Sequence, residues 1–506
     1  MGPDVAVLER GIEVPPGEFP ESLTDAAGQV RTEASPLGIF DFNFGEDLDS
    51  LTGNVLGGGS QLYCGVSLEP LPETFRNTRS DRPQGRRRAW PSSLNLESLD
   101  PYFQRVRHRL EVERWLDGTE VGSSDDFRHE LTGSWAWDVS DGVDPATGQP
   151  LRDAEGLDVR RRPPLRRLAA FDQAARQAFG PGSTRTVPIA VNVTRHHDSV
   201  NGYGVDRSAC TACGRWITGC NVRAKNSLTA NYLALAVQHG SSIHTGTEVT
   251  HIRPSERPGL RWALFCRIRD ANGAVHPRVI HTNLAVVGAG VFGTGSILFN
   301  SRRRGLQLSS MLGTRVSGNG DAISIARDWS PEFDQQLPLD VMEEQGPTIT
   351  RMVDMRDKQG RRCLIQGAVA PEALLKILSG VLRARYGSST GEGVTPEGLD
   401  RSMVMLAMGY DAAQGRLVQR HGRIQVEWPD AGRDPVQLAT RQATKDLATA
   451  MGADYVANPR LGSHNAGTPT TVHALGGAPM GSNGADCVVD EYGRLQNEQQ
   501  RAHPGL

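Results

Sequence analysis

A glycine pattern near residue 290 constrains the fold of this chain more than any other feature. The segment VVGAGVFG sets Gly288, Gly290 and Gly293 in the spacing G-x-G-x-x-G, after an apolar run and before a helix-like stretch that reaches Asn300. A strand, a glycine turn and a helix in this order are typical of folds that place a pyrophosphate on a helix N-terminus. That role also requires an acid at the end of a second strand, about twenty residues later. No such strand follows here, so close strand–helix packing is the preferred interpretation, with a phosphate loop as the alternative.

A short strand-like run opens the chain and ends in an acid. Residues 4–9 read DVAVLE, and Arg10-Gly11 turns the chain afterwards. In dinucleotide-binding folds the second strand ends in an acid that accepts hydrogen bonds from ribose hydroxyls. Glu9 fits that position, although eight residues leave no room before it for the glycine turn. An ordinary edge strand would look the same, so both interpretations stay open.

Composition favours a globular protein of several domains. The chain has 506 residues with a net charge of −3, from 55 Lys and Arg against 58 Asp and Glu. This balance argues against a dedicated nucleic-acid binder, which normally carries a basic surplus. The longest weakly polar run, LAVVGAGVFGTGSILF, is short for a membrane span and contains four glycines. The N-terminus shows no signal-peptide pattern, so we expect no transmembrane segment and a cytoplasmic location.

Periodicity predicts several elements around these motifs. Helical spacing covers 92–112 and 225–239, alternation predicts a strand over 241–252, and further strands are expected at 259–269 and 278–287. A second glycine-dense patch, GNVLGGGS at 53–60, precedes an extended stretch from Leu62 to Val66.

Three of the seven cysteines lie close together in the sequence. Cys210, Cys213 and Cys220 approach a C-x₂-C-x₂-C-x₃-C spacing, in which Trp216 occupies the third ligand position. An iron–sulfur cluster or a zinc site would need another ligand from elsewhere. We therefore expect no metal, and keep an iron–sulfur electron carrier as an alternative function.

His473 is the most prominent candidate for proton chemistry. It lies in TTVHALGGAPMG, where two glycine-containing pairs require the backbone to approach something closely. A lone histidine after a β-branched run is otherwise most often a packed or surface residue.

Seven segments together resemble one family. In family order they match the glucose–methanol–choline (GMC) oxidoreductases, nearest to the bacterial cholesterol-oxidase-like branch. The segments are VAVLERG (5–11), GNVLGGGSQLYCGVSLEP (53–70), CTACGRWITGCNVRAKNSLTANYL (210–233), TGTEVTHI (245–252), VVGAGVFGTGSILFNSRRRGLQLSSMLG (286–313), SGNGD (317–321) and TVHALGGAPMG (471–481).

The resemblance implies an α/β fold with an incomplete Rossmann-like FAD-binding domain. A second α+β domain, which binds substrate, would be built on a mainly antiparallel sheet of six strands. The expected parts are FAD-binding segments at 1–70, 196–320 and 456–506, substrate-side insertions at 71–195, and the substrate domain at 321–455.

The resemblance also implies roles for particular residues. Glu9 would bind the adenosine ribose, the backbone of Val249 would meet the adenine, and His473 would lie beside flavin N5 and the substrate hydroxyl. The flavin and pyrophosphate would be lined by Gly58, Gly59, Tyr63, Cys64 and Val66. The Gly288–Gly293 pattern becomes the family's second signature and not its phosphate loop.

The implied activity is FAD-dependent oxidation of an alcohol by hydride transfer to flavin N5. A sterol-like or other hydrophobic alcohol would be the substrate, and oxygen or another acceptor would take the electrons. His473 would assist removal of the hydroxyl proton, since small shifts of its pKa make it a base at neutral pH.

The sequence departs from the family in two places. Tyr63-Cys64 stands where relatives commonly have Asn near the flavin. The family's N-terminal GxGxxG and its C-terminal Asn-Pro or His-Pro are missing, since Asn458-Pro459 precedes His473. We therefore expect a chain truncated at both ends, which leaves its own activity open. The alternative function is a non-catalytic, degenerate fragment of the same fold that acts as a binding protein.

Overall fold

The computed structural model describes most of the chain. The described residues are 4–21, 23–76, 90–115, 165–193, 199–270, 272–330, 332, 346–369, 401–458, 467–482, 486–499 and 501–506. Parts of the predicted segments 71–195 and 321–455 lie outside them, namely 77–89, 116–164, 194–195, 331, 333–345 and 370–400, and so does Pro459.

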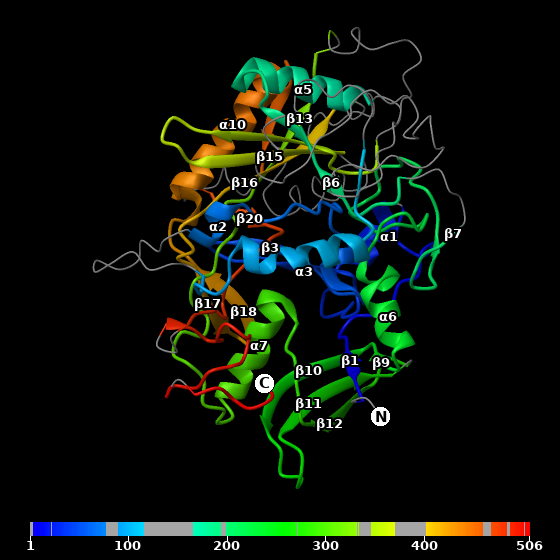
Figure 1. The fold of residues 1–506 in the computed structure, drawn as a ribbon, viewed down its shortest axis with the longest axis vertical. Helices are drawn as coiled ribbons and strands as arrows, with labels where there is room; N and C mark the ends of the chain where they lie inside the picture. Colours follow the sequence, from blue (N-terminus) through cyan, green and yellow to red (C-terminus); the bar gives the residue numbers. More distant parts are fainter. Residues whose placement is uncertain are drawn as a thin grey trace.

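An antiparallel sheet of six strands forms one end of the molecule (Figure 1). Its order is β19-β13-β16-β15-β14-β5, and every neighbouring pair is antiparallel. The strands are β5 (Thr184–Thr186), β13 (Ala322–Arg327), β14 (Arg351–Arg356), β15 (Arg362–Val369), β16 (Met403–Met408) and β19 (Asp454–Ala457). The expectation of a mainly antiparallel sheet of six strands is therefore confirmed, with β5 contributed by an earlier part of the chain.

Apolar side chains leave this sheet on both faces, because successive residues of a strand point to opposite sides. On one face Met403, Met405 and Ala407 of β16 pack in a cluster with residues of the helices α5 (Arg166–Phe179) and α10 (Pro435–Ala450). On the other face Val404 joins a second cluster, which includes Met352, Ala368, Ile189 and Val191, and Cys64 and Val66 pack against it. The sheet thus covers the segment that follows the glycine patch.

The opposite end holds smaller sheets. β1 (Ala6–Leu8) pairs in parallel with β9 (Ser242–His244), and β10 (Thr247–Pro254), β11 (Trp262–Arg269) and β12 (Val275–Thr282) form an antiparallel sheet. Helix α7 (Gly290–Arg302) packs on β10, and both ends of the chain lie near these strands (Figure 1).

A further sheet of three strands, called the third sheet below, lies between the two ends of the molecule. β2 (Phe40–Asn43) pairs with β3 (Asp49–Gly53), and β20 (Thr470–Thr471) adds to β3 in parallel. A 3₁₀ helix, η1 (Gly58–Gln61), follows β3, and the hairpin of β17 (Arg416–Arg420) and β18 (Arg423–Glu427) packs against α7.

Shorter elements complete the described chain. They are α1 (Leu23–Gly28), α2 (Pro72–Arg76), α3 (Leu96–Arg109), β4 (Glu113–Arg114), β6 (Pro188–Ile189), β7 (Ser199–Val200), β8 (Asp206–Arg207), η2 (Leu228–Ala230), α6 (Tyr232–Gln238) and η5 (Ala431–Arg433). Among the described residues, no helix combines the length and the apolar character that crossing a membrane requires.

Three expectations about local structure are wrong. The predicted helix 225–239 is shortened to α6, because Lys225 pairs with Val191 in a β-bridge and the Asn231 side chain caps the helix at Tyr232. The predicted strand 241–252 is interrupted at residues 245–246, where Gly246 has a φ of 63°. The predicted strand 278–287 ends at Thr282 in β12.

Candidate active site

His473 is held by a buried carboxylate. Its Nδ1 lies 3.0 Å from Oδ2 of Asp321, whose side chain is fully buried, while the His473 side chain is 40% exposed. Burial lowers the pKa of His473, but the charge of Asp321 and its hydrogen bond raise it, and the net shift is upward. Nε2 has no hydrogen-bond partner among the described residues, so it is the ring nitrogen available to a ligand.

The glycine patch forms an open turn. Gly57 and Gly58 have φ values of 90° and 54°, a left-handed conformation that glycine adopts without strain. A Cβ added at Gly58 or Gly59 would meet no atom within 4 Å, whereas one at Gly53 would lie 2.8 Å from the backbone of Gly58. The loop therefore packs closely against Gly53 of β3, whereas the space next to the Cα atoms of Gly58 and Gly59 is free.

The third sheet places the strand that precedes His473 beside the strand that leads to this loop. Thr471 of β20 pairs with Ser50 of β3, and the two strands run in parallel. His473 follows β20 at the same end of the sheet at which β3 continues through Gly53 to the loop. Residues more than 400 positions apart in the sequence thus share one edge.

Glu9 directly follows β1, and its backbone is hydrogen-bonded to β10, the strand that carries Val249. The carbonyl of Glu9 accepts a hydrogen bond from Thr247 N at 2.7 Å, and Val249 lies two residues further along β10, paired with Cys266. The Glu9 carboxylate accepts a hydrogen bond from Gly11 N at 2.6 Å. Burial raises the pKa of Glu9 more than its backbone hydrogen bonds and the adjacent arginine lower it.

The turn after Glu9 is fitted directly against the start of the glycine loop. Leu56 N donates to the carbonyl of Ile12 at 2.8 Å, and Ile12 forms a parallel bridge with Val55. A Cβ at Gly11 would lie 2.3 Å from the carbonyl oxygen of Asn54. The segments predicted to bind the two halves of a dinucleotide are therefore neighbours.

Tyr63, Cys64 and Val66 leave the loop under the six-stranded sheet. The carbonyl of Cys64 accepts a hydrogen bond from Thr348 Oγ1 at 2.6 Å, and the stretch expected to be strand or extended chain ends in an isolated bridge between Val66 and Ile189. Desolvation raises the pKa of the Cys64 thiol to about 12 and raises that of Tyr63 as well. Both side chains are therefore neutral at physiological pH.

A buried lysine fastens this segment to the cysteine motif. Lys225 Nζ donates to the carbonyls of Gln61 at 2.5 Å, Tyr63 at 3.0 Å and Trp216 at 2.8 Å. Its burial lowers its pKa to about 8. Cys220 Sγ accepts from Lys225 N, and all seven cysteines are free. Among the described residues, no group of three or more His, Cys, Asp or Glu side chains is arranged to hold a metal ion.

Helix α7 begins at the predicted glycine pattern. Gly290 has a φ of 69°, and a Cβ at Gly288 or Gly290 would meet nothing within 4 Å. Further along the helix, a Cβ at Gly293 would lie 2.9 Å from Ala289 Cβ, and one at Gly295 2.8 Å from Leu417. Close packing thus explains the later glycines, while the first two face open space.

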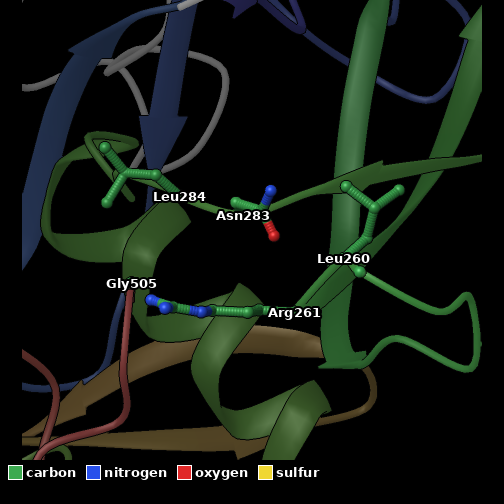
Figure 2. A pocket seen from close by; sticks show the side chains of 6 residues that line it. Leu260, Arg261, Asn283, Leu284 and Gly505 are labelled. Carbon is green, nitrogen blue, oxygen red and sulfur yellow. The ribbon is translucent and has the colours of Figure 1, made fainter.

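A surface pocket lies away from these residues (Figure 2). It is lined by Gly259, Leu260, Arg261, Asn283, Leu284 and Gly505, and contains none of the predicted site residues. Its rim is tied together where Ala285 N donates to the carbonyl of Gly505 at 2.8 Å.

Two functional candidates escaped the sequence analysis. Asp321 ends the SGNGD segment that carries part of the resemblance, and an acid after a glycine turn before a strand was the available signal. Lys225 is one of only four lysines in the chain, and the sequence pattern predicts it only as the first residue of the helix 225–239.

Comparison with known proteins gives sequence relatives of one kind. The chain is 25% identical to a cholesterol oxidase of Acinetobacter baumannii over 341 residues, which cover 66% of this chain and 53% of the relative. It is 27% identical to a cholesterol oxidase of Mycobacterium tuberculosis over 357 residues, 63% of this chain and 57% of the relative. The chain thus spans little more than half the length of these relatives. No protein-family model matches it.

The fold is shared with a solved flavoprotein. Formate oxidase of Aspergillus oryzae, a protein with FAD, superposes with a TM-score of 0.51 at 11% identity, over 96% of this chain and 86% of that one. This match confirms the expected α/β fold class with a Rossmann-like domain. Sequence relation and fold together confirm that the chain resembles the GMC oxidoreductases, on their cholesterol-oxidase-like branch.

Proposed function

We propose that this chain carries the core of an FAD-dependent oxidoreductase that oxidises an alcohol. The names of its sequence relatives and the fold of formate oxidase support the class of reaction. The observation that carries the proposal is the pair of His473 and Asp321, which lies at the sheet edge shared with the open glycine loop.

The residues fit the proposed cofactor. The open space beside Gly58 and Gly59 leaves room for a planar ring system or a phosphate to approach the backbone. Glu9 and Val249 lie together on adjoining strands, in the positions proposed for the ribose and the adenine. When bound, FAD would supply the acceptor for hydride at its N5.

The chain's own contribution is proton handling and positioning. With Nδ1 engaged by Asp321, His473 presents Nε2 as the base for the hydroxyl proton of the alcohol. The negative charge of Asp321 then stabilises the imidazolium that forms. Tyr63 and Cys64 are uncharged and serve as lining, not as acids or bases.

Substrate and acceptor follow from the relatives by analogy. We propose a hydrophobic alcohol, with sterols as the first compounds to examine, and oxygen as the first acceptor. The five-part division into FAD-binding and substrate-side segments and the cytoplasmic location stay predictions.

Replacement of His473 tests the function. His473→Ala should reduce turnover per bound flavin by about 10²- to 10⁴-fold, the usual contribution of a general base. Flavin content should stay as in the wild type, whereas thermal stability should fall, because the buried Asp321 carboxylate loses one of its donors; turnover is therefore expressed per bound flavin. His244→Ala is the matched control, because His244 is exposed and its ring contacts only Ser242 among the described residues. Unchanged turnover per flavin in His473→Ala would remove His473 from the reaction, and a protein inactive on every alcohol would favour the non-catalytic alternative.

A further inference from the structure

Asp321 accepts hydrogen bonds from three successive residues of the turn that carries His473. Its Oδ2 accepts hydrogen bonds from Thr471 Oγ1 at 2.8 Å, Val472 N at 3.0 Å and His473 Nδ1 at 3.0 Å. Its Oδ1 accepts a hydrogen bond from Asn319 Nδ2 at 3.1 Å. With a side chain exposed to 0%, this carboxylate has no solvent contact that competes with these donors.

The backbone of Asp321 is held at the start of the six-stranded sheet. The residue immediately precedes β13, and its carbonyl accepts a hydrogen bond from Gln437 of α10 at 3.0 Å. The loop before it is held by Asp411, whose carboxylate accepts from Gly318 N at 2.9 Å and Gly320 N at 3.0 Å. The carboxylate of Asp321 therefore sits on a rigid support.

The pair lies where two sheets meet: β13 contacts β20, and Ser317 forms an antiparallel bridge with Leu475. His473 follows β20 of the third sheet, whereas Asp321 immediately precedes β13 of the six-stranded sheet. The ring of His473 is consequently oriented by a group from the proposed substrate side and stands next to the proposed flavin side.

We propose that Asp321 is the positioning residue for His473, which fixes the proton on Nδ1, sets the ring plane and leaves Nε2 as the basic nitrogen. This inference rests on the proposed function of His473. A hydrogen bond from Nδ1–H to a carboxylate selects this tautomer and makes the other nitrogen more basic. The upward shift of the His473 pKa agrees with it, and the charge that causes the rise is that of Asp321.

A purely structural role makes a different prediction. Asp321 would then serve only to anchor the turn at Thr471, and loss of any one of its hydrogen bonds would act alike. Thr471→Val is the matched control, because it removes one of these bonds, together with the acceptor of the His473 backbone N, and leaves the charge of Asp321 beside His473.

The first test reads the tautomer in the unaltered protein. In ¹⁵N-histidine-labelled protein, with His473 assigned by loss of its signals in His473→Gln, the neutral ring should show Nδ1 protonated and Nε2 unprotonated. The ring should titrate above pH 6.5, the ordinary value. A neutral ring protonated on Nε2 would overturn the proposal, whatever the activity.

The second test uses Asp321→Asn. The midpoint of the His473 titration should fall by at least one pH unit, and kcat should fall at least tenfold with KM changed less than threefold. The acidic limb of the pH–rate profile should shift with the titration. In Thr471→Val the titration should stay within about 0.3 units of the wild type. An equal titration in Asp321→Asn and wild type would overturn the proposal, and if that variant does not fold, the tautomer decides.

These readouts separate the two hypotheses. The tautomer and the titration need no turnover, so they test Asp321 even if the proposed oxidation is wrong. Full turnover in His473→Ala would refute the proposed function, even if the His473 tautomer in the unaltered protein were as expected. The positioning role in catalysis would then be overturned with it.

Discussion

The open space above Gly59 makes one substitution especially informative. Gly59 lies inside η1 without a positive φ, so alanine is accepted by its backbone. A Cβ there meets no protein atom within 4 Å. Gly59→Ala should therefore leave the free energy of unfolding of the flavin-free protein unchanged, or raise it by about 0.4–1 kcal/mol through the unfolded state.

The same methyl group should interfere with a cofactor that fills this open space. Overpacking by one methyl costs about 1–3 kcal/mol, which corresponds to about a 5- to 150-fold loss of affinity. FAD affinity is measured by quenching of flavin fluorescence, and stability by urea unfolding without FAD. Gly28→Ala is the control, since a Cβ there also meets nothing within 4 Å but lies at the end of α1. A Gly59→Ala protein that binds FAD as tightly as the wild type would refute the assignment of this loop to the cofactor.

Two further predictions concern the framework of the site. Gly11→Ala should destabilise the flavin-free protein by about 1–3 kcal/mol, because its Cβ would lie 2.3 Å from the backbone oxygen of Asn54; a urea midpoint equal to that of the wild type would show that the two segments are not fitted together. His251 is stacked on Phe265 at 4.3 Å, and burial and nearby arginines lower its pKa from 6.5 to about 4. Between these two pH values the unfolded chain binds more protons than the folded protein, so stability falls as the pH drops through this range. His251→Phe should lose less stability than the wild type between pH 7 and pH 4.5 in urea unfolding, and an identical loss would contradict the shift.

Local patterns predicted the parts of the fold that depend on neighbours in the sequence. Helix α7 begins at Gly290 and covers the expected stretch, since the glycine pattern and the apolar run after it are continuous in the chain. The expected run 259–269 became β11 for the same reason. The resemblance added the antiparallel sheet, which no single segment specifies.

The predicted helix at 225–239 failed because a tertiary contact overrode a correct local pattern. The sequence KNSLTANYLALAVQH has helical spacing throughout, but Lys225 gives its three donors to carbonyls of Gln61, Tyr63 and Trp216. Hydrogen bonds to a charged group are worth about 1.5–3 kcal/mol each, more than the few tenths per residue that separate most helix propensities. The segment is therefore extended at Lys225, and the helix begins only at Tyr232.

The candidate site shows why residue types alone located His473 but not its partner. A histidine among glycines is visible in the sequence, whereas Asp321 is separated from it by 152 positions and lies in an ordinary turn sequence. What distinguishes Asp321 is complete burial with three donors of one turn directed at it, and burial of a charge is tolerated only where hydrogen bonds compensate. Since that compensation is supplied by Thr471, Val472 and His473 themselves, moving any of them would leave a buried charge with fewer donors. The histidine and the carboxylate therefore fix each other's position, which is what a proton-transfer site needs before any substrate arrives.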